Sequence, residues 1–329
     1  MKAITQVEYG PADQVLGLSD IDKPSIGDGE VLVRVHSAGL DRSVWHLMAG
    51  LPYPVRLAGY GLRAPRNNVP GSDVAGRVEA VGKDVTSFKP GDEVFGVGNG
   101  SFAQYVSCRQ GALAPKPENL TFEQAAAVPV SALTALQALR DHGRIQPGQK
   151  VLIIGASGGV GTFAVQIAKA LGAEVTGVCS STKVDLVRSI GADHVIDYTQ
   201  GDFAAGLHRY DVILDTGGNT SLRRLRRTLT PTGTLVIVGA ETGGRWLGGT
   251  DRQLRAMMMS PFIGQKLGTF LASVNKSDLL AVSELIESGQ VAPVMDRTFP
   301  LGEVPAAIRY MTEGRARGKV VISVTEPER

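Results

Sequence analysis

The chain of 329 residues contains few cysteines and few histidines. Its two cysteines, Cys108 and Cys179, lie far apart and form no C-x-x-C pair. This spacing predicts neither a disulfide framework nor a cysteine-rich metal site, and it is typical of proteins from a reducing cytoplasm. The five histidines are scattered. No H-x-x-x-H metal motif and no Ser/His/Asp catalytic set can therefore be assembled from the sequence.

Long apolar runs and an excess of charge are also missing. No segment approaches the roughly 18 uninterrupted apolar residues that a membrane span needs, and the first ten residues alternate like a strand instead of forming the apolar part of a signal peptide. The 34 basic and 32 acidic residues nearly cancel. We interpret one basic run, Arg223 to Arg227, as the solvated face of a helix rather than an anion contact. We expect a cytoplasmic protein with no nucleic-acid partner and no membrane partner.

Residues 151–183 have the pattern of a dinucleotide-binding strand, turn and helix. Val151 to Ile154 is a continuous apolar run, as in a parallel strand buried on both faces. The apolar residues after the turn recur at helical spacing, Gly172 stands where a helix C-cap glycine belongs, and Glu174 to Val178 forms a second apolar strand. In the turn, missing Cβ atoms would let a pyrophosphate approach backbone N–H groups. The glycines concerned are Gly155, Gly158, Gly159 and Gly161. The alternative is a tight glycine turn without a ligand.

The end of the second strand indicates which dinucleotide binds. An NAD site has an Asp or Glu about 20 residues after the turn, where it accepts hydrogen bonds from the ribose 2′-hydroxyl. Here the sequence from Cys179 to Lys183 is C-S-S-T-K, which offers hydroxyl groups and an ammonium and no carboxylate. These groups suit a 2′-phosphate and favour NADPH. The alternative is that Ser180 caps the next helix and that Lys183 is merely solvated.

The chain divides into two regions with different secondary-structure patterns. Residues 1–125 are β-rich, with strands expected at Glu30 to His36 and Val74 to Val81. Glu123 to Arg140 is helical, and Pro129 should divide it into two helices. Strands and helices then alternate, which predicts a doubly wound parallel sheet, and residues from about 291 onward should return to the first domain. We expect an α/β protein whose β-rich domain (1–125 and 291–329) surrounds a nucleotide-binding domain (126–290). Pro52 to Asn68 and Glu241 to Phe270 have no recognisable pattern and are expected to be loops near the substrate.

Several motifs match a known family. They are Val69-Pro-Gly-Ser-Asp-Val-Ala-Gly76, Phe88-Lys-Pro-Gly-Asp-Glu-Val-Phe-Gly96, Ala125-Ala-Ala-Val-Pro129, Gly191-Ala-Asp-His-Val-Ile-Asp-Tyr198, Asp211-Val-Ile-Leu-Asp215 and Gly318-Lys-Val-Val-Ile322. With these motifs the chain resembles, from end to end, the medium-chain dehydrogenase/reductase superfamily, and within it the zinc-free quinone-oxidoreductase-like branch. The resemblance implies a GroES-like catalytic domain, an inserted Rossmann domain, and an active site in the cleft between them.

Zinc ligands are replaced at the positions where relatives have them. By resemblance these places fall at Asp41, at Ser72 and near Val130. A carboxylate, a hydroxyl and an alkyl group do not make a zinc site, and the lobe that carries four cysteines in zinc-dependent relatives has no counterpart. We therefore expect no metal.

The resemblance also implies which residues hold NADPH. The backbone of Ser157 to Val160 would meet the pyrophosphate. Thr134, Gly239 and Ala240 would lie near the nicotinamide, and Lys319 would reach a phosphate. The expected contacts of the 2′-phosphate are Ser180, Lys183 and Tyr198, although a tyrosine that begins a loop is more often simply half-buried.

Catalytic candidates lie between Asp41 and Tyr60. By resemblance Tyr53 lines the substrate cleft, and its phenol would donate to the carbonyl oxygen or protonate the α-carbon. Asp41 replaces an asparagine that is common in this branch, and it would bind the nicotinamide ribose or order a water. Tyr60 is a second candidate donor. For His46 we expect a structural role.

The expected activity is metal-free hydride transfer from NADPH to a quinone or an α,β-unsaturated carbonyl, since such acceptors are already electrophilic. One alternative is a zinc-free aldehyde or ketone reductase. Another is a non-catalytic NADPH-binding protein. We also expect a homodimer formed near the sheet edge at Thr234 to Val238.

Overall fold

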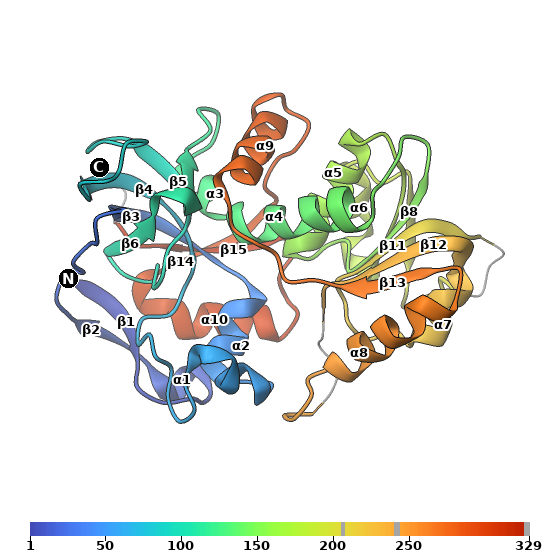
Figure 1. Ribbon diagram of the computed structural model, residues 1–329, viewed down its shortest axis with the longest axis horizontal. Helices are drawn as coiled ribbons and strands as arrows, with labels where there is room; N and C mark the ends of the chain where they lie inside the picture. Colours follow the sequence, from blue (N-terminus) through green and yellow to red (C-terminus); the bar gives the residue numbers. More distant parts are fainter. Residues whose placement is uncertain (205–207, 240–243, 326–329) are drawn as a thin grey trace. The chain divides into compact units, whose positions relative to one another are not determined.

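The computed structural model describes residues 1–204, 208–239 and 244–325, and the chain forms two compact units (Figure 1). The first unit comprises Met1–Ser131, Val274–Glu287 and Pro293–Arg329, and the second comprises Ala132–Ser273 and Ser288–Ala292. The predicted domain limits stay a prediction. The units differ from them mainly at helix α9 (Lys276–Glu287), which belongs to the first unit and accepts a hydrogen bond there, from Asn119 Nδ2 to Ile286 O at 3.0 Å.

A seven-stranded sheet forms the centre of the first unit, in the order β14-β15-β3-β4-β5-β7, with β6 also pairing with β3. Its strands are β3 (Glu30–Leu40), β4 (Asp73–Val81), β5 (Glu93–Val97), β6 (Tyr105–Arg109), β7 (Leu113–Pro115), β14 (Met295–Pro300) and β15 (Lys319–Ser323). β1 (Lys2–Gln6) and β2 (Leu16–Asp20) form a separate antiparallel pair. The helices are α1 (Ala12–Val15), α2 (Arg42–Ala49), α3 (Phe122–Ala126), α9 and α10 (Val304–Thr312).

Strand β3 holds this sheet together. Val31, Val33 and Val35 are all fully buried and contribute to one hydrophobic core. β15 pairs with the end of β3, with Val320 opposite Leu40, so the C-terminal strand belongs to the sheet of the first unit.

The second unit is a six-stranded parallel sheet with the order β10-β9-β8-β11-β12-β13. Its strands are β8 (Lys150–Ile154), β9 (Glu174–Cys179), β10 (His194–Asp197), β11 (Tyr210–Asp215), β12 (Leu229–Ile237) and β13 (Lys266–Thr269). Its helices are α4 (Pro129–Gln137, which begins in the first unit), α5 (Gly159–Ala170), α6 (Val184–Ser189), α7 (Leu222–Thr228) and α8 (Thr250–Met259). The predicted fold class is confirmed: the chain combines a GroES-like sheet domain with a doubly wound Rossmann-type domain.

The apolar run of β8 explains its central position. Its residues from Val151 to Ile154 are buried, and Leu152 and Ile154 belong to the core on one face. α5 and α6 lie on one side of the sheet, and α7 and α8 lie on the other (Figure 1). The chain passes from β8 to β9 on one side and later places β11 on the other. The carboxyl ends of β8 and β11 therefore form the switch point at which open α/β sheets bind ligands.

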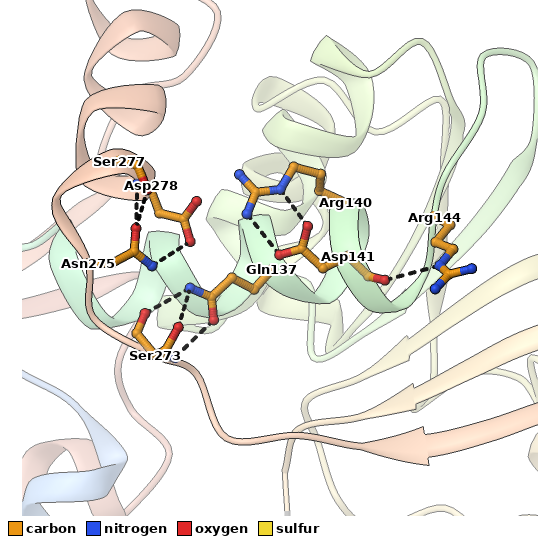
Figure 2. A network of polar contacts seen from close by, with 8 residues as sticks. All are labelled: Gln137, Arg140, Asp141, Arg144, Ser273, Asn275, Ser277 and Asp278. Carbon is orange, nitrogen blue, oxygen red and sulfur yellow. Dashed lines mark hydrogen bonds and ion pairs between the residues drawn. The ribbon is translucent and has the colours of Figure 1, made fainter.

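The helical segment before β8 divides at Pro129 as predicted. α3 ends at Ala126, α4 begins at Pro129, and a π-helical turn follows at Ala138–His142. Figure 2 shows how Gln137, at the end of α4, is fixed: Nε2 donates to Ser273 O at 2.7 Å, and Ser273 N donates back to Oε1 at 3.0 Å. The same figure shows Asn275 at the start of α9, where its Oδ1 accepts hydrogen bonds from Asp278 N and from the Ser277 hydroxyl.

The expectation of a loop from Glu241 to Phe270 is wrong in part, because both α8 and β13 lie within this segment. α8 buries only Ala256 among its residues. Its sequence is polar on average, so it lacks the apolar content that marks a core-facing helix. Strand β13 lies outside β12, so β12 is next to the edge of the sheet and β13 forms the edge. Within the described parts of the chain, no helix is long and apolar enough to cross a membrane.

Candidate nicotinamide-cofactor site

The glycine turn joins β8 to α5 at the switch point. Gly155 has φ +82°, and Gly158 N donates to Gly155 O at 3.0 Å. A Cβ at Gly161 would stand 2.1 Å from Gly155 O, so even alanine would collide with the turn. α5 has no side-chain N-cap and no acidic residue in its first turn. Its first amides and the positive end of its dipole are thus available to an anion.

Thr216, at the end of β11, braces this turn. Its Oγ1 donates to Ile154 O at 2.8 Å and lies 3.5 Å from Gly155 O. A Cβ on Gly155 would lie only 2.4 Å from Thr216 Oγ1. Thr216 was not among the predicted site residues, although its position directly after the strand that ends at Asp215 was a usable signal.

The expected 2′-phosphate residues come together at the ends of β9 and β10. The two strands are paired with Cys179 opposite Asp197, and Tyr198 N donates to Cys179 O at 3.1 Å. Ser180 precedes a 3₁₀ turn, Ser181–Lys183, and makes no side-chain capping bond to it. The Tyr198 side chain is 59% exposed.

A carboxylate that the sequence argument did not consider lies at this same edge. Asp197 Oδ1 accepts hydrogen bonds from the backbone N–H and the hydroxyl of Thr199, at 2.9 and 2.7 Å. Hydrogen bonds from the hydroxyls of Ser181 and Thr199 lower the pKa of Asp197, so it is charged at neutral pH. The register of β9 and β10 brings it opposite Cys179, although it is distant from the glycine turn in sequence.

The residues expected near the nicotinamide are placed as follows. Gly239 is the second residue after β12, and its N–H donates to Asp215 O at 3.1 Å. Thr134 is buried on α4, at 7% exposure. Ala240 lies outside the described residues. The carboxyl ends of β8, β11 and β12 thus bring together the glycine turn, Thr216 and Gly239.

In the first unit, Asp41 is the N-cap of α2. Its Oδ1 accepts hydrogen bonds from Ser43 N at 2.7 Å and from Val44 N at 3.3 Å. Its Oδ2 is buried and carries no hydrogen bond within the described part of the chain. One oxygen therefore has a structural role, while the other remains an acceptor. The sequence analysis had not recognised this capping role.

Tyr53 is half-buried in the segment after α2. The guanidinium of Arg56 lies over its ring, 4.9 Å from the centroid, and also over the ring of Tyr9 at 4.4 Å. Arg56 Nε donates to Gly50 O at 2.9 Å. This stack orients the Tyr53 ring, whereas Tyr60 is exposed.

Lys319 is buried in the first unit, where sequence reasoning expected a phosphate contact. Its side chain is 1% exposed, Nζ donates to Ser131 Oγ at 3.0 Å, and Asp73 Oδ2 lies 3.6 Å away. Asp73 is fully buried, and its Oδ1 accepts a hydrogen bond from Val130 N at 3.0 Å. The phosphate contact of Lys319 stays a prediction, but its ammonium already has two partners.

Burial is the main influence on Asp73. It raises the pKa of Asp73 to about 7, while Lys319 opposes this shift and Asp41 adds to it. The carboxyl group therefore titrates near neutral pH, unlike most aspartates.

The positions of the zinc ligands in relatives do not form a metal site here. Asp41 caps α2, and the backbone N–H of Val130 is bonded to Asp73. Over residues 1–204, 208–239 and 244–325, no three His, Cys, Asp or Glu side chains are grouped so that they could hold a metal ion. A serine hydroxyl and one capping carboxylate do not fit a catalytic zinc.

Comparison with known proteins identifies the family of the chain. Residues 27–118 match the model of the alcohol dehydrogenase GroES-like domain, and residues 190–322 match that of the zinc-binding dehydrogenases. The mouse (Mus musculus) NAD(P)H oxidoreductase RTN4IP1, mitochondrial, is 35% identical over 90% of this chain and 82% of its own length. The 2-methylene-furan-3-one reductase of Solanum lycopersicum is 32% identical over 98% of this chain and 79% of its own length.

Among solved structures, the quinone oxidoreductase from Coxiella burnetii superposes with a TM-score of 0.87, at 28% identity and over 99% of both chains. The chain belongs to the medium-chain dehydrogenase/reductase superfamily, in its quinone-oxidoreductase-like branch. It is an oxidoreductase that uses a nicotinamide cofactor and a small-molecule substrate.

The pKa of Asp73 predicts how stability depends on pH. Between about pH 4, where an unfolded aspartate titrates, and pH 7, the folded chain keeps a proton that the unfolded chain loses. The stabilisation is therefore present below this window and is lost as the pH rises through it. Relative to Asp73→Asn, the wild type should lose at least about 1 kcal/mol of unfolding free energy from pH 4.5 to 7.5, measured by urea denaturation.

Asp20→Asn is the control for this measurement. A hydrogen bond from Lys2 lowers the pKa of Asp20, so Asp20 is charged in both the folded and the unfolded chain from about pH 4.5 to 7.5, and its substitution should leave the pH dependence over this range unchanged. A difference between wild type and Asp73→Asn that is constant or grows with pH would contradict the burial of a protonated Asp73.

Proposed function

We propose that this protein is an NADPH-dependent reductase that transfers hydride to a quinone or an α,β-unsaturated carbonyl without a metal. The observation that carries the proposal is the glycine turn at the switch point, together with Ser180 and Lys183 at the end of β9. The names of two relatives support the acceptor class. One is a quinone oxidoreductase, and the other reduces a 2-methylene-furan-3-one, in which the methylene group is conjugated to the carbonyl.

Each part of the cofactor has residues suited to it. The backbone of the turn from Ser157 to Val160, at a helix start that no side chain caps, would bind the pyrophosphate. Ser180, Lys183 and Tyr198 would hold the 2′-phosphate, and the backbone at Gly239 would support the nicotinamide. When bound, NADPH would supply a hydride from its nicotinamide ring.

The first unit supplies the remaining groups. The Tyr53 phenol, oriented by Arg56, would donate a proton or a hydrogen bond to the acceptor. Asp41 Oδ2, which the N-cap leaves available, would accept a hydrogen bond from the nicotinamide ribose or hold a water. Neither group polarises a saturated carbonyl as strongly as a metal ion would, so an acceptor that is already electrophilic is favoured.

A cytoplasmic location is part of the same proposal. Both cysteines are free and buried, as suits a reducing compartment. The mouse relative is named a mitochondrial protein, which makes the compartment a separate question from the chemistry.

The substrate class can be tested by NADPH oxidation assays with 1,4-benzoquinone, a 2-enone and the matching saturated ketone. We expect kcat/KM for the quinone or the enone to exceed that for the ketone at least about 100-fold, or about 2.7 kcal/mol in activation free energy. Turnover of the saturated ketone alone would identify an aldehyde or ketone reductase instead. Tight NADPH binding with no turnover of any carbonyl compound would identify a non-catalytic binding protein.

Cofactor preference depends on Lys183. Lys183→Ala removes the cation expected beside the 2′-phosphate, so KM for NADPH should rise about tenfold or more while KM for NADH changes less than about twofold. Lys150→Ala, at the amino end of β8, should change neither value. Asp197 opposes NADPH by repulsion, so Asp197→Asn should lower KM for NADPH. Equal effects of Lys183→Ala on both cofactors would contradict the phosphate contact.

We further propose a homodimer that pairs β13 with its copy. Among the described strands β13 is the last of its sheet, and Phe262 and Leu271 on either side of it are 87% and 96% exposed. The double variant Phe262→Glu/Leu271→Glu should convert a dimer into a monomer at micromolar concentration in size-exclusion light scattering. Leu280→Glu on α9 serves as the control. A wild-type monomer would refute the proposed dimer.

A further inference from the structure

Arg252, on helix α8, joins three segments at the carboxyl edge of the second unit's sheet. Its Nη1 donates to Asp215 Oδ2 at 2.6 Å and to Thr220 O at 2.7 Å, and its Nη2 donates to Gly239 O at 3.2 Å. The Arg252 side chain is 12% exposed and that of Asp215 is fully buried. The planar guanidinium offers several donors in fixed directions, which a lysine ammonium on a flexible stem does not reproduce.

Asp215 connects this cation to the ends of two strands. Its Oδ1 accepts hydrogen bonds from Gly217 N at 3.2 Å and Gly218 N at 3.1 Å, so the carboxylate fixes the loop after β11. Its backbone oxygen accepts hydrogen bonds from Val238 N and Gly239 N, where the chain leaves β12. One residue therefore determines the direction of both loops.

The arrangement continues to the glycine turn. Thr216, next to Asp215, bonds to Ile154 O through its hydroxyl. On its other side, a Cβ on Gly239 would stand 2.2 Å from Thr216 O, so the two backbones are in the closest contact that glycine allows. Thr216 therefore contacts the glycine turn on one side and Gly239 on the other. Arg252 bonds to Gly239 at the end of this row of contacts.

We propose that Arg252 is the positioning residue for the nicotinamide half of the bound cofactor. By holding Gly239 O and Asp215 together, it fixes the backbone against which the nicotinamide is expected to lie. This inference rests on the proposed function, which places the nicotinamide beside Gly239. In the described part of the chain the guanidinium donates to neither the glycine turn nor the end of β9. Binding of the adenosine end should therefore not depend on it.

The test compares two ligands that share the adenosine end. Adenosine 2′,5′-bisphosphate reaches the 2′-phosphate residues but has no nicotinamide, whereas NADPH has both ends. In calorimetric titrations, Arg252→Met should raise Kd for NADPH about tenfold or more and change Kd for the bisphosphate less than about twofold. Arg255→Met is the matched control: Arg255 lies one turn later on α8, is 73% exposed, and pairs with Asp251. It should change neither Kd.

Two further variants keep the test decisive, because Arg252→Met leaves a buried carboxylate without its cation and can prevent folding. Arg252→Lys retains the charge but not the three-way geometry, so it should also weaken NADPH selectively. Asp215→Asn/Arg252→Met removes both charges, and its effect on NADPH should be smaller than the product of the single effects, because the two side chains act as a unit.

The outcomes separate the two proposals. If the wild type binds both ligands and the Arg252 variants weaken both equally or neither, the positioning role is overturned and the proposed function stands. If the wild type binds neither ligand, the proposed function fails and the inference fails with it. Selective loss of NADPH affinity, with an unchanged melting temperature for Arg252→Lys, supports the inference.

Discussion

Each unit of this protein contains a fully buried carboxylate that must be neutralised by one nearby cation. In the first unit Asp73 lies 3.6 Å from Lys319, and in the second Asp215 lies 2.6 Å from Arg252. A carboxylate removed from water is costly unless hydrogen bonds and a counter-charge replace its hydration. Each carboxylate accepts hydrogen bonds from backbone amides and has a cation near it. Each therefore connects chain segments that are distant in sequence.

The two pairs differ in the quality of their geometry. The guanidinium of Arg252 contacts Asp215 at normal hydrogen-bond length and also donates from Nη1 and Nη2 to two backbone oxygens, while its buried Nε has no hydrogen bond within the described residues. The Lys319 ammonium is closer to Ser131 than to Asp73, and Asp73 Oδ2 has no hydrogen bond within the described residues. Burial then outweighs the attraction, which raises the pKa of Asp73. Such a pair is suited to fixing a fold and is sensitive to pH, whereas the Asp215 pair is suited to fixing a loop.

The sequence predicted those parts of the structure that depend on local chemistry. The apolar run at Val151, the glycine turn and the helix after it follow from backbone and side-chain preferences that act over a few residues, and so does the break at Pro129. Pairings between distant residues were not accessible in the same way. The register of β9 and β10 alone places Asp197 beside the residues expected to bind the 2′-phosphate. In the same way, nothing in the sequence around Arg252 indicates that its side chain is buried. α8 was overlooked because a polar contact holds it and it buries little apolar surface.

Where metal ligands stand in relatives, this chain uses its polar groups to build the fold. Asp41 Oδ1 caps α2, and the amide of Val130 neutralises part of Asp73. In the proposed function the acceptor is already activated, because a conjugated carbonyl or a quinone accepts hydride without a Lewis acid. The rate would then be limited by how well the two reacting carbons are aligned, since positioning alone contributes several kcal/mol to such reactions. If alignment limits the rate, the hydrogen bonds from Arg252 to Gly239 O and Asp215 are the feature of the second unit from which we expect the greatest influence on turnover.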